Sequence, residues 1–401
     1  MPMPKGLAAI PRGVWALGLV SLCMDLSSEL IHAILPLYLA VGLGASMLTI
    51  GLIEGAAEAL ALIVKMFSGV ISDLFARRKP LVVLGYGLAA ASKFVFPLAT
   101  TLGWVVGARF ADRVGKGIRG APRDALIADI APPALRGASF GLRQALDTVG
   151  GFGGPLLALA ALAYFAGDFR AAFWVAVVPA ALAVVLLVVA VDEPARPASV
   201  DQGARKMPMR REEIRRLGSR YAVVVAIAAI LTLARFSEAF LVLRAQNVGV
   251  PLTRAPIVMV VMSLVYAATA YPAGAAADRG HGGRLLSAGL LALMVADVVL
   301  AGADGAPLVY VGAALWGLHM GLTQGLLSAL VAASAPADLR GTAFGLFNLV
   351  SGVALLVASV LAGWLWEVRG PAMTFYAGAI FATIAWLALI VYRRGARWDL
   401  A

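Results

Sequence analysis

Residues 132–142 of this chain read PPALRGASFGL, and 204 positions later residues 336–346 read PADLRGTAFGL. A second pair of related segments, GVISD at 69–73 and GAAAD at 274–278, is offset by 205. Each pair occupies the same place in its half of the chain. Matches in register at one long period indicate a tandem duplication, so the sequence predicts two halves of similar fold.

The amino-acid composition indicates the environment in which the two halves fold. Of 401 residues, 61% are hydrophobic and 14% are charged, whereas soluble domains are roughly half apolar and about a quarter charged. A membrane-spanning helix needs about 20 apolar residues. Twelve such segments are predicted, at residues 13–42, 47–74, 80–100, 104–130, 138–166, 169–191, 220–246, 255–276, 283–303, 306–332, 341–365 and 371–392. We therefore expect an all-α membrane protein of twelve transmembrane helices in two pseudo-symmetric six-helix bundles.

The segment between the halves has a different composition. Residues 192–219 lose all hydrophobic runs and gain proline, glycine and charge. We expect an N-terminal bundle at 1–191, a basic linker at 192–219 and a C-terminal bundle at 220–401. The end of the linker, MRREEIRRLGS, is either a short amphipathic helix on anionic headgroups or a solvated tether.

The positions of the basic residues predict the orientation. They gather on alternate loops, so the net charge of +11 reflects membrane topology and not a nucleic-acid surface. By the positive-inside rule both termini are cytoplasmic in a multi-pass protein of the inner (plasma) membrane. The richer side carries Arg77, Arg78, Lys79, Arg136, Arg279, Arg284, Arg340, Arg393, Arg394 and Arg397 in addition to the linker.

Several classes of chemistry are disfavoured by residue counts. Cys23 is the single cysteine, and the three histidines are scattered, so neither a disulfide nor a metal cluster is expected. The Gly115-Lys116 pair lacks the other residues of a phosphate-binding loop. We expect no enzyme activity, no cofactor and no resident metal.

Three motifs resemble those of the major facilitator superfamily, and the resemblance covers essentially the whole chain. The loop Gly69-x-x-x-Asp73-x-x-x-Arg77-Arg78-Lys79 is similar to its signature loop, although Leu74 and Ala76 depart from the usual Arg and Gly. The second-half copy retains Asp278-Arg279. The fourth span's Arg113-Val-Gly-Lys116-Gly117 looks like the R-x-x-Q-G motif with Lys in place of Gln.

The fifth span adds a motif that bears on direction. Its Gly150, Gly154 and Pro155 are similar to the G-x-x-x-G-P motif associated with antiporters of that superfamily, without the trailing glycine pair. Other stretches look like a bacterial branch whose members are mostly poorly characterised, so the resemblance implies the fold and says little of the substrate.

The resemblance also implies a cytoplasmic gate. Asp73 would engage the start of the helix that begins near Gly341, where unsatisfied N–H groups attract a carboxylate. Arg77 would pair with Asp129. The gate residues it implies are Gly69, Asp73, Arg77, Asp129, Asp278 and Arg279.

Charged residues inside the predicted spans are the main functional signal, because each costs on the order of 2.5–3.5 kcal/mol at a helix centre. Asp25, Glu29 and His32 share one helix face, and Asp112 is four residues from Lys116 and can pair with it. The candidates for proton coupling or the substrate path are Asp25, Glu29, Glu54, Glu58, Arg109, Asp112, Arg113, Lys116, Arg119, Arg123, Asp124, Arg143, Asp147, Arg235, Glu238, His319 and Gln324. Either these are static pairs that hold helices in register, or carboxylates of the first two spans carry protons to which Arg113 responds.

Together these features predict a secondary active transporter working by alternating access, with proton-coupled efflux of a small organic compound as the first hypothesis. The alternative is proton-coupled or facilitated uptake of a nutrient, metal complex or siderophore. A non-transporting membrane sensor is the remaining class. The expected partners are a small-molecule substrate, protons and the lipid bilayer, with no nucleic acid, and the expected state is a monomer.

Overall fold

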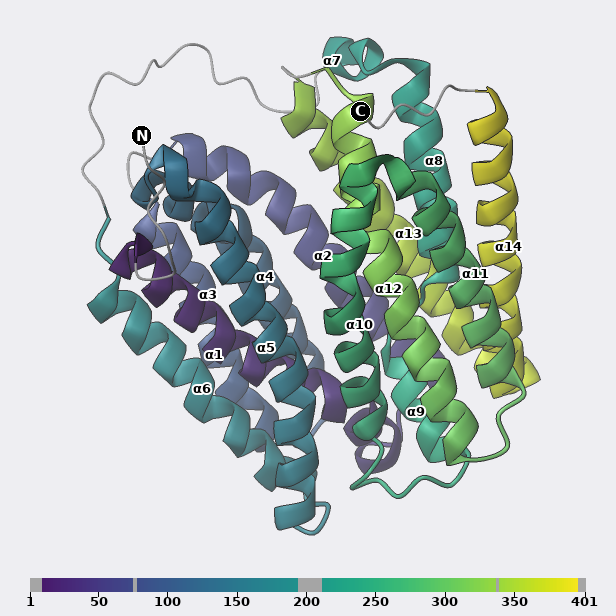
Figure 1. The fold of residues 1–401 in the computed structure, drawn as a ribbon. Helices are drawn as coiled ribbons and strands as arrows, with labels where there is room; N and C mark the ends of the chain where they lie inside the picture. The colour runs from purple at the N-terminus through teal and green to yellow at the C-terminus, as the bar shows by residue number, and fades with distance from the viewer. Residues whose placement is uncertain (1–8, 75–77, 194–210, 337–338, 396–401) are drawn as a thin grey trace. The chain divides into compact units, whose positions relative to one another are not determined.

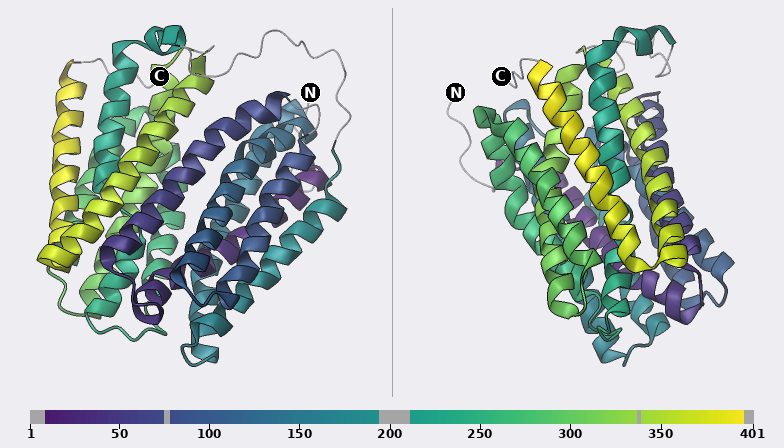
Figure 2. Two further views of the ribbon diagram at one scale, coloured as in Figure 1. Left: turned by 180° about the vertical axis from the view of Figure 1, so that it is seen from behind. Right: turned by 90° about the vertical axis from the view of Figure 1, so that its right-hand side faces the viewer.

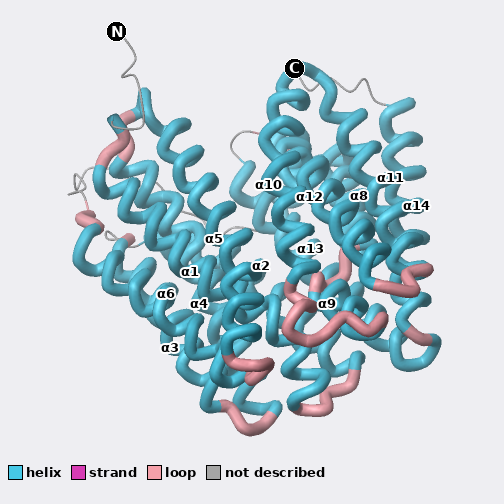
Figure 3. The backbone as a smooth tube through the Cα atoms, turned by 60° about the horizontal axis from the view of Figure 1, so that its bottom comes forward, coloured by secondary structure: helices cyan, strands magenta, loops and turns pink. Residues whose placement is uncertain are grey.

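A computed structural model describes residues 9–74, 78–193, 211–336 and 339–395. Helices make up these ranges, with short loops between them and no strand (Figure 3). In chain order the elements are α1 (Arg12–Leu37), η2 (Tyr38–Gly42), α2 (Met47–Leu74), α3 (Lys79–Leu98), α4 (Leu102–Ile130), η3 (Pro133–Leu135), α5 (Arg136–Tyr164), α6 (Phe169–Ala190), α7 (Arg211–Arg216), α8 (Gly218–Ala234), α9 (Ala239–Asn247), α10 (Ile257–Ala276), η4 (Ala277–His281), α11 (Gly282–Ala301), α12 (Ala306–Ser334), α13 (Arg340–Arg369) and α14 (Pro371–Gly395) (Figure 1).

The helices confirm the predicted spans, with one correction. Within the described ranges eleven spans are long and apolar enough to cross a membrane, and α4 is the twelfth long helix but too charged to meet that criterion. The seventh span, predicted as one helix over 220–246, is broken: α8 ends at Ala234 and α9 begins at Ala239. The prediction of a continuous helix there was wrong, because the Arg235–Glu238 segment holds neither proline nor glycine to signal the break.

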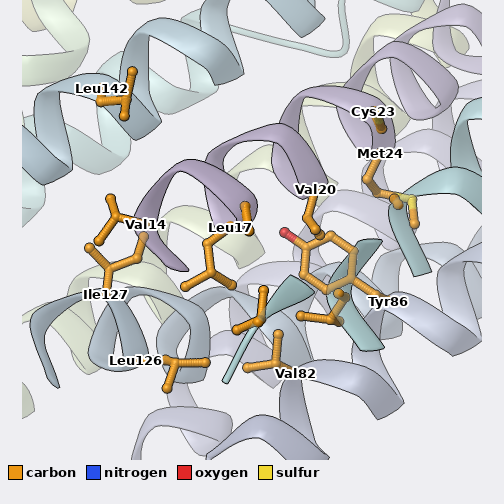
Figure 4. Packing of buried hydrophobic residues seen from close by; sticks show 14 of the residues in the cluster. Val14, Leu17, Val20, Cys23, Met24, Val82, Tyr86, Leu126, Ile127 and Leu142 are labelled. Atoms are coloured by element: carbon orange, nitrogen blue, oxygen red, sulfur yellow. The ribbon is translucent and has the colours of Figure 1, made fainter. Parts of the chain in front are cut away.

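The contacts divide the chain into two compact units. The first comprises Met1–Ile34 and Leu60–Met207, and it holds most of α1, the end of α2, and α3 to α6. Its apolar core joins α1, α3, α4, α5 and α6, and includes Cys23 as a packing residue (Figure 4). The labelled members are Val14, Leu17, Val20, Cys23, Met24, Val82, Tyr86, Leu126, Ile127 and Leu142.

The second unit comprises Leu35–Ala59 and Pro208–Ala401. It holds α8 to α14 together with the start of α2, although those early residues belong to the first half of the sequence. Tyr221 on α8 donates a hydrogen bond to the carbonyl of Ala343 on α13 at 2.7 Å. Leucines of α8, α11, α12 and α14 fill a further cluster, made of Leu231, Leu286, Leu290, Leu326, Leu327 and Leu389.

Each unit repeats the helix contacts of the other. In the first, a Cβ on Gly85 of α3 would lie 2.7 Å from the backbone nitrogen of Arg119 on α4. In the second, a Cβ on Gly289 of α11 would lie 2.5 Å from Cγ2 of Thr323 on α12. Gly85 and Gly289 are 204 residues apart, as are Arg119 and Thr323. The same offset that relates the two sequences therefore relates their packing, which supports the predicted pseudo-symmetric fold.

A stripe of small residues joins the start of α2 to α13 inside the second unit. Gly51 lies against the carbonyl of Ser359, and a Cβ on Gly55 would lie 2.9 Å from the Ser359 Cβ. Gly363 in turn faces the backbone of Met47 and Leu48. Small residues four apart on both helices let their backbones approach closely, and both helices can be followed by their colours in Figure 2. We call Gly51, Gly55, Ser359 and Gly363 the α2–α13 stripe.

Candidate functional site

A buried ion cluster lies where α3 and α4 meet. Lys93 Nζ is 2.7 Å from Asp112 Oδ1 and 3.1 Å from Ser28 Oγ of α1, while Arg113 Nη2 is 3.3 Å from Asp112 Oδ2. Lys93 is 0% and Asp112 1% exposed. The predicted pairing of Asp112 with Lys116 was wrong, because Lys116 points outward and is exposed while Asp112 turns to α3. We refer to Lys93, Asp112 and Arg113 as the α4 ion cluster.

Two further arginines of α4 are fully buried. Arg109 Nη2 lies 3.0 Å from Nδ1 of His32, which connects α4 to the polar face of α1. Arg119 is 4.7 Å from the centre of the Tyr86 ring, a cation–π distance. These guanidinium groups stay charged at any physiological pH, so α4 places permanent positive charge in the interior of the first unit.

A second polar network joins α1, α4 and α5. Arg143 Nη1 pairs with Asp147 Oδ2 at 2.8 Å and lies 3.6 Å from Asp124 Oδ1. Arg123 Nη2 lies 3.0 Å from Asp124 Oδ1, and Arg123 Nη1 lies 3.9 Å from Asp147 Oδ1. Asp25 interacts electrostatically with Arg123 and Asp147. These five side chains, Asp25, Arg123, Asp124, Arg143 and Asp147, form what we call the α1–α4–α5 network.

The break in the seventh span places polar groups inside the second unit. Arg235 follows the last turn of α8, and Glu238 precedes the first turn of α9. Both positions suit the helix dipole, since a cation is stabilised at a C-terminus and an anion at an N-terminus. The backbone N–H of Ser237 donates to Ser359 Oγ at 3.1 Å. Discontinuous spans of this kind form substrate and ion sites in secondary transporters.

Aromatic side chains surround that break. Phe236 lies 5.3 Å from Trp316 and 5.5 Å from Phe375, measured between ring centres. His319, one turn beyond Trp316 on α12, shares a 2.8 Å hydrogen bond between its Nδ1 and the carbonyl of Gly289. Gln324 is half-buried on the same helix.

The two glutamates of α2 both fall in the second unit, in the part of α2 that precedes residue 60. Glu54 is fully buried and Glu58 is half-buried. Among the residues with described positions, no three His, Cys, Asp or Glu side chains converge as metal ligands. The polar groups of each unit can interact with a solute through their charges and hydrogen bonds.

Two buried charges escaped the sequence reasoning: Lys93 on α3 and Asp297 on α11, which is 0% exposed. A signal for both exists in the sequence. Each is the one charged residue away from the ends of an otherwise apolar span, and they are 204 residues apart. Aligning the halves position by position would have revealed the pair.

Comparison with known proteins gives the chain its family. The sequence matches the Major Facilitator Superfamily over residues 17–353 and again over 220–399. The chain belongs to the Major Facilitator Superfamily. It is 32% identical to an uncharacterised MFS-type transporter of Methanocaldococcus jannaschii, over 95% of both chains, and 29% identical to an uncharacterised protein of Mycobacterium bovis, over 89% of this chain and 87% of the relative. The protein is thus a membrane transporter of the major facilitator type.

Solved superfamily structures share the fold at low sequence identity. The nucleoside transporter NupG superposes with a TM-score of 0.79 at 13% identity, covering 94% of this chain and 99% of its own. A bacterial homologue of the human lysosomal transporter Spinster, in an inward-facing conformation, gives 0.75 at 16% identity over 99% and 100% of the two chains. These likenesses establish the major facilitator fold and leave the substrate open.

The superfamily's signature loop is partly described. Arg77 and the side chains of Asp73 and Asp278 lie outside the described part of the chain, so their gate roles stay predictions. Within it, Arg78 Nε lies 3.4 Å from Asp129 Oδ2, which ties the start of α3 to the end of α4. Gly69 faces Ala121 of α4, and Arg279 is exposed.

The antiporter-like motif of α5 packs on the acidic face of α1. A Cβ on Gly150 would lie 2.8 Å from the Cβ of Asp25, and one on Gly154 would lie 2.5 Å from the Cβ of Glu29. Pro155 is buried beside them. The two glycines therefore bring the α5 backbone directly against the carboxylate-bearing residues of α1, which links this superfamily motif to two of the predicted proton carriers.

Gly154→Leu is expected to destabilise the first unit by about 1–3 kcal/mol, because the new side chain must displace α1 at Glu29. Thermal unfolding of the purified protein in detergent measures the effect. Gly151→Leu is the matched control, since a Cβ at Gly151 meets nothing within 4 Å. Equal unfolding temperatures for the two variants would contradict the close α1–α5 contact.

Proposed function

We propose that this protein is a secondary active transporter that exports a small organic compound in exchange for protons, by alternating access. The α1–α4–α5 network carries the proposal. It sets three carboxylates, Asp25, Asp124 and Asp147, against two guanidinium groups in a membrane-embedded bundle. Asp147 Oδ1 is buried and makes no hydrogen bond among the described residues. Asp147 is the carboxylate proposed to take up the proton, while Asp124 also interacts electrostatically with Lys65 of α2.

The chemistry of exchange follows from the charges. When Asp147 is ionised, it holds Arg143 and draws Arg123 between α4 and α5. Protonation removes one negative charge and weakens both pairs, and each broken buried pair leaves a cation in search of water or substrate. A proton and a cationic group of the solute would compete for the same carboxylate, which is the thermodynamic condition for exchange.

Other residues have places in this proposal. Asp25 and Glu29 on α1 and Glu54 and Glu58 on α2 are proposed to be proton carriers, and Arg113 is proposed to respond to their protonation. The bundles at residues 1–191 and 220–401 are proposed to move relative to each other about the linker. We place the monomeric protein in the inner (plasma) membrane with both termini in the cytoplasm, from the distribution of basic loops. Export is favoured by the antiporter-like motif of α5.

The test is proton movement driven by a solute. Proteoliposomes with a trapped pH-sensitive dye and an imposed pH gradient are challenged with lipophilic cations, organic anions, sugars and nucleosides. We expect at least one class to collapse the gradient, and Asp147→Asn to reduce that rate about tenfold or more, a change of ~1.4 kcal/mol.

Asp168→Asn is the matched control for Asp147→Asn. Asp168 lies outside the network, at the start of α6, where its carboxylate accepts the N–H groups of Arg170 and Ala171. Asparagine caps a helix as well as aspartate does, so this variant should keep the wild-type rate. Solute flux that proceeds equally with and without the pH gradient, in wild type and Asp147→Asn alike, would rule out proton coupling.

A second candidate function is uptake of an anionic nutrient, metal complex or siderophore. The buried arginines of α4 favour it, since Arg109, Arg113 and Arg119 outnumber the one buried acid of that helix, Asp112. In the same vesicles, uptake predicts that an inward proton gradient accelerates inward movement of an organic anion. Exchange predicts that this gradient accelerates outward movement.

A further inference from the structure

Asp297 is a buried carboxyl group of the second unit. It lies in the last third of α11 and is 0% exposed. Neither of its oxygens makes a hydrogen bond among the described residues. Burial of an ionised carboxylate without a hydrogen bond or cation costs several kcal/mol or more. The position of Asp297 therefore bears on whether its carboxyl group carries a proton.

Apolar and aromatic groups surround the carboxyl. A Cβ on Gly378 of α14 would lie 2.5 Å from Asp297 Oδ2 and 3.1 Å from Cε1 of Phe236 at the helix break. The ring of Phe236 packs in turn on Trp316 and Phe375. The glycine gives the carboxyl its space, and the Phe236 ring lies close to the same point of α14.

The described charged groups on the neighbouring elements are directed elsewhere: the buried Arg244 of α9 donates hydrogen bonds to the carbonyls of Leu300, Ala301 and Ala303 at the end of α11. On α12 the titratable side chain nearest in sequence to Trp316 is His319, and its Nδ1 is directed to Gly289, about two turns before Asp297 on α11. On α14, Tyr376 is 43% exposed. The exposed His281 of η4 is sixteen residues earlier, about 24 Å along the helix axis.

The internal repeat shows how this site arose. Asp297 occupies the position of Lys93, and Trp316 occupies that of Asp112, both at the offset of 204. In the first unit the two positions form a 2.7 Å ion pair. In the second unit the ammonium is exchanged for a carboxyl and the carboxylate for an indole, whose N–H also makes no hydrogen bond among the described residues. Both units thus carry polar side chains at this point of the helix pair, with a cation in the first unit and a carboxyl in the second.

We propose that Asp297 is a proton-binding site of the second unit, separate from the α1–α4–α5 network, and occupied in the conformation described. A proton neutralises the carboxyl without further ligands. A sodium ion, by contrast, would need several oxygen atoms around it. The binding of a proton by Asp297 does not depend on the proposed function. Its role as a second proton in the transport cycle rests on the proposed function.

Loss of that proton would act on the helix break. An ionised Asp297 must gain water or a cation, and Arg235 is the cation carried by the adjacent break. Release of the proton therefore favours a conformation in which Phe236 leaves Asp297 and Arg235 approaches it. The protonation of Asp297 would in this way depend on the conformation of the discontinuous span.

The experiment is infrared difference spectroscopy of the purified protein in lipid nanodiscs at neutral pH. We expect a C=O stretching band of a protonated carboxyl that shifts in D₂O and is lost in Asp297→Asn. Asp304→Asn is the control in the same unit, because Asp304 is exposed and should leave the band unchanged. If Asp297→Asn does not fold, Asp297→Ser replaces it. A protonated-carboxyl region identical in wild type and in the Asp297 variant overturns the inference.

Vesicle flux separates this inference from the proposed function. Asp297→Asn should lower the number of protons moved per solute while Asp304→Asn keeps it. If the infrared band of the wild type is lost in Asp297→Asn but the wild type moves no solute, the proton site is supported and the proposed exchange is rejected. If the wild type shows proton-coupled flux but has no band that depends on Asp297, the proton site is rejected and the proposed exchange is kept.

Discussion

Asp112→Ala is expected to lower the free energy of unfolding by about 3–5 kcal/mol. The substitution removes the carboxylate that pairs with Lys93 and Arg113, which are 0% and 1% exposed. Both cations would remain buried, and Lys93 would keep only Ser28 as its hydrogen-bond partner. Denaturant or thermal unfolding in detergent, followed by circular dichroism, measures the loss.

Two control variants test whether the loss of stability comes from uncompensated buried charges. Asp124→Ala removes a carboxylate from the same helix at a site whose side chain is 36% exposed, and it should cost about 0–1 kcal/mol. The double variant Lys93→Met with Asp112→Leu removes two of the three charges and leaves only Arg113 without this carboxylate, so it should cost less than Asp112→Ala. A single variant no more damaging than the double one would show that the α4 ion cluster does not depend on charge compensation.

Gly51→Leu is expected to stop solute transport by preventing the α2–α13 stripe from closing. The Gly51 backbone lies against the Ser359 carbonyl, so a leucine there cannot be accommodated without moving a helix. Overpacking of about 1–3 kcal/mol shifts a conformational equilibrium by roughly 5–150-fold. Flux in proteoliposomes and the stability of the variant, measured side by side, test the effect.

The matched control for Gly51→Leu is Gly107→Leu on α4. A Cβ at Gly107 meets nothing within 4 Å, so the same change of size should leave flux within about twofold of wild type. Reduced flux in a variant that still folds is the expected signature of a conformational block. Normal flux in Gly51→Leu would mean that the contact between α2 and α13 is not needed in the transport cycle.

The helices were predictable because the bilayer imposes a length and an apolar composition on every span. The segment predicted at 47–74 is observed as Met47–Leu74, and that at 169–191 as Phe169–Ala190. The break after Ala234 was not predictable from the local sequence. It is held by contacts to another helix, such as the hydrogen bond from Ser237 to Ser359, which lies 122 positions away.

The same distinction applies to the ion pairs: the spacing within one helix predicts some of them, and the packing between helices decides others. Arg143 and Asp147 lie four apart on one helix, and the 2.8 Å bond between them follows from that spacing. Asp112 and Lys116 have the same spacing, but a better-placed cation on α3 takes the carboxylate. A helical repeat specifies neighbours within one helix, whereas the choice between α3 and solvent depends on how two helices are packed.

The charge of α4 also has a consequence for biosynthesis. Each charged residue at the centre of a span adds about 2.5–3.5 kcal/mol to the free energy of leaving the translocon for lipid, so α4 is a poor candidate for partitioning alone. Lys93 of the preceding helix forms an ion pair with Asp112 at 2.7 Å. α3 and α4 should thus be released laterally as a prepaired hairpin, with the later helices of the first unit gathering around it as they emerge from the ribosome.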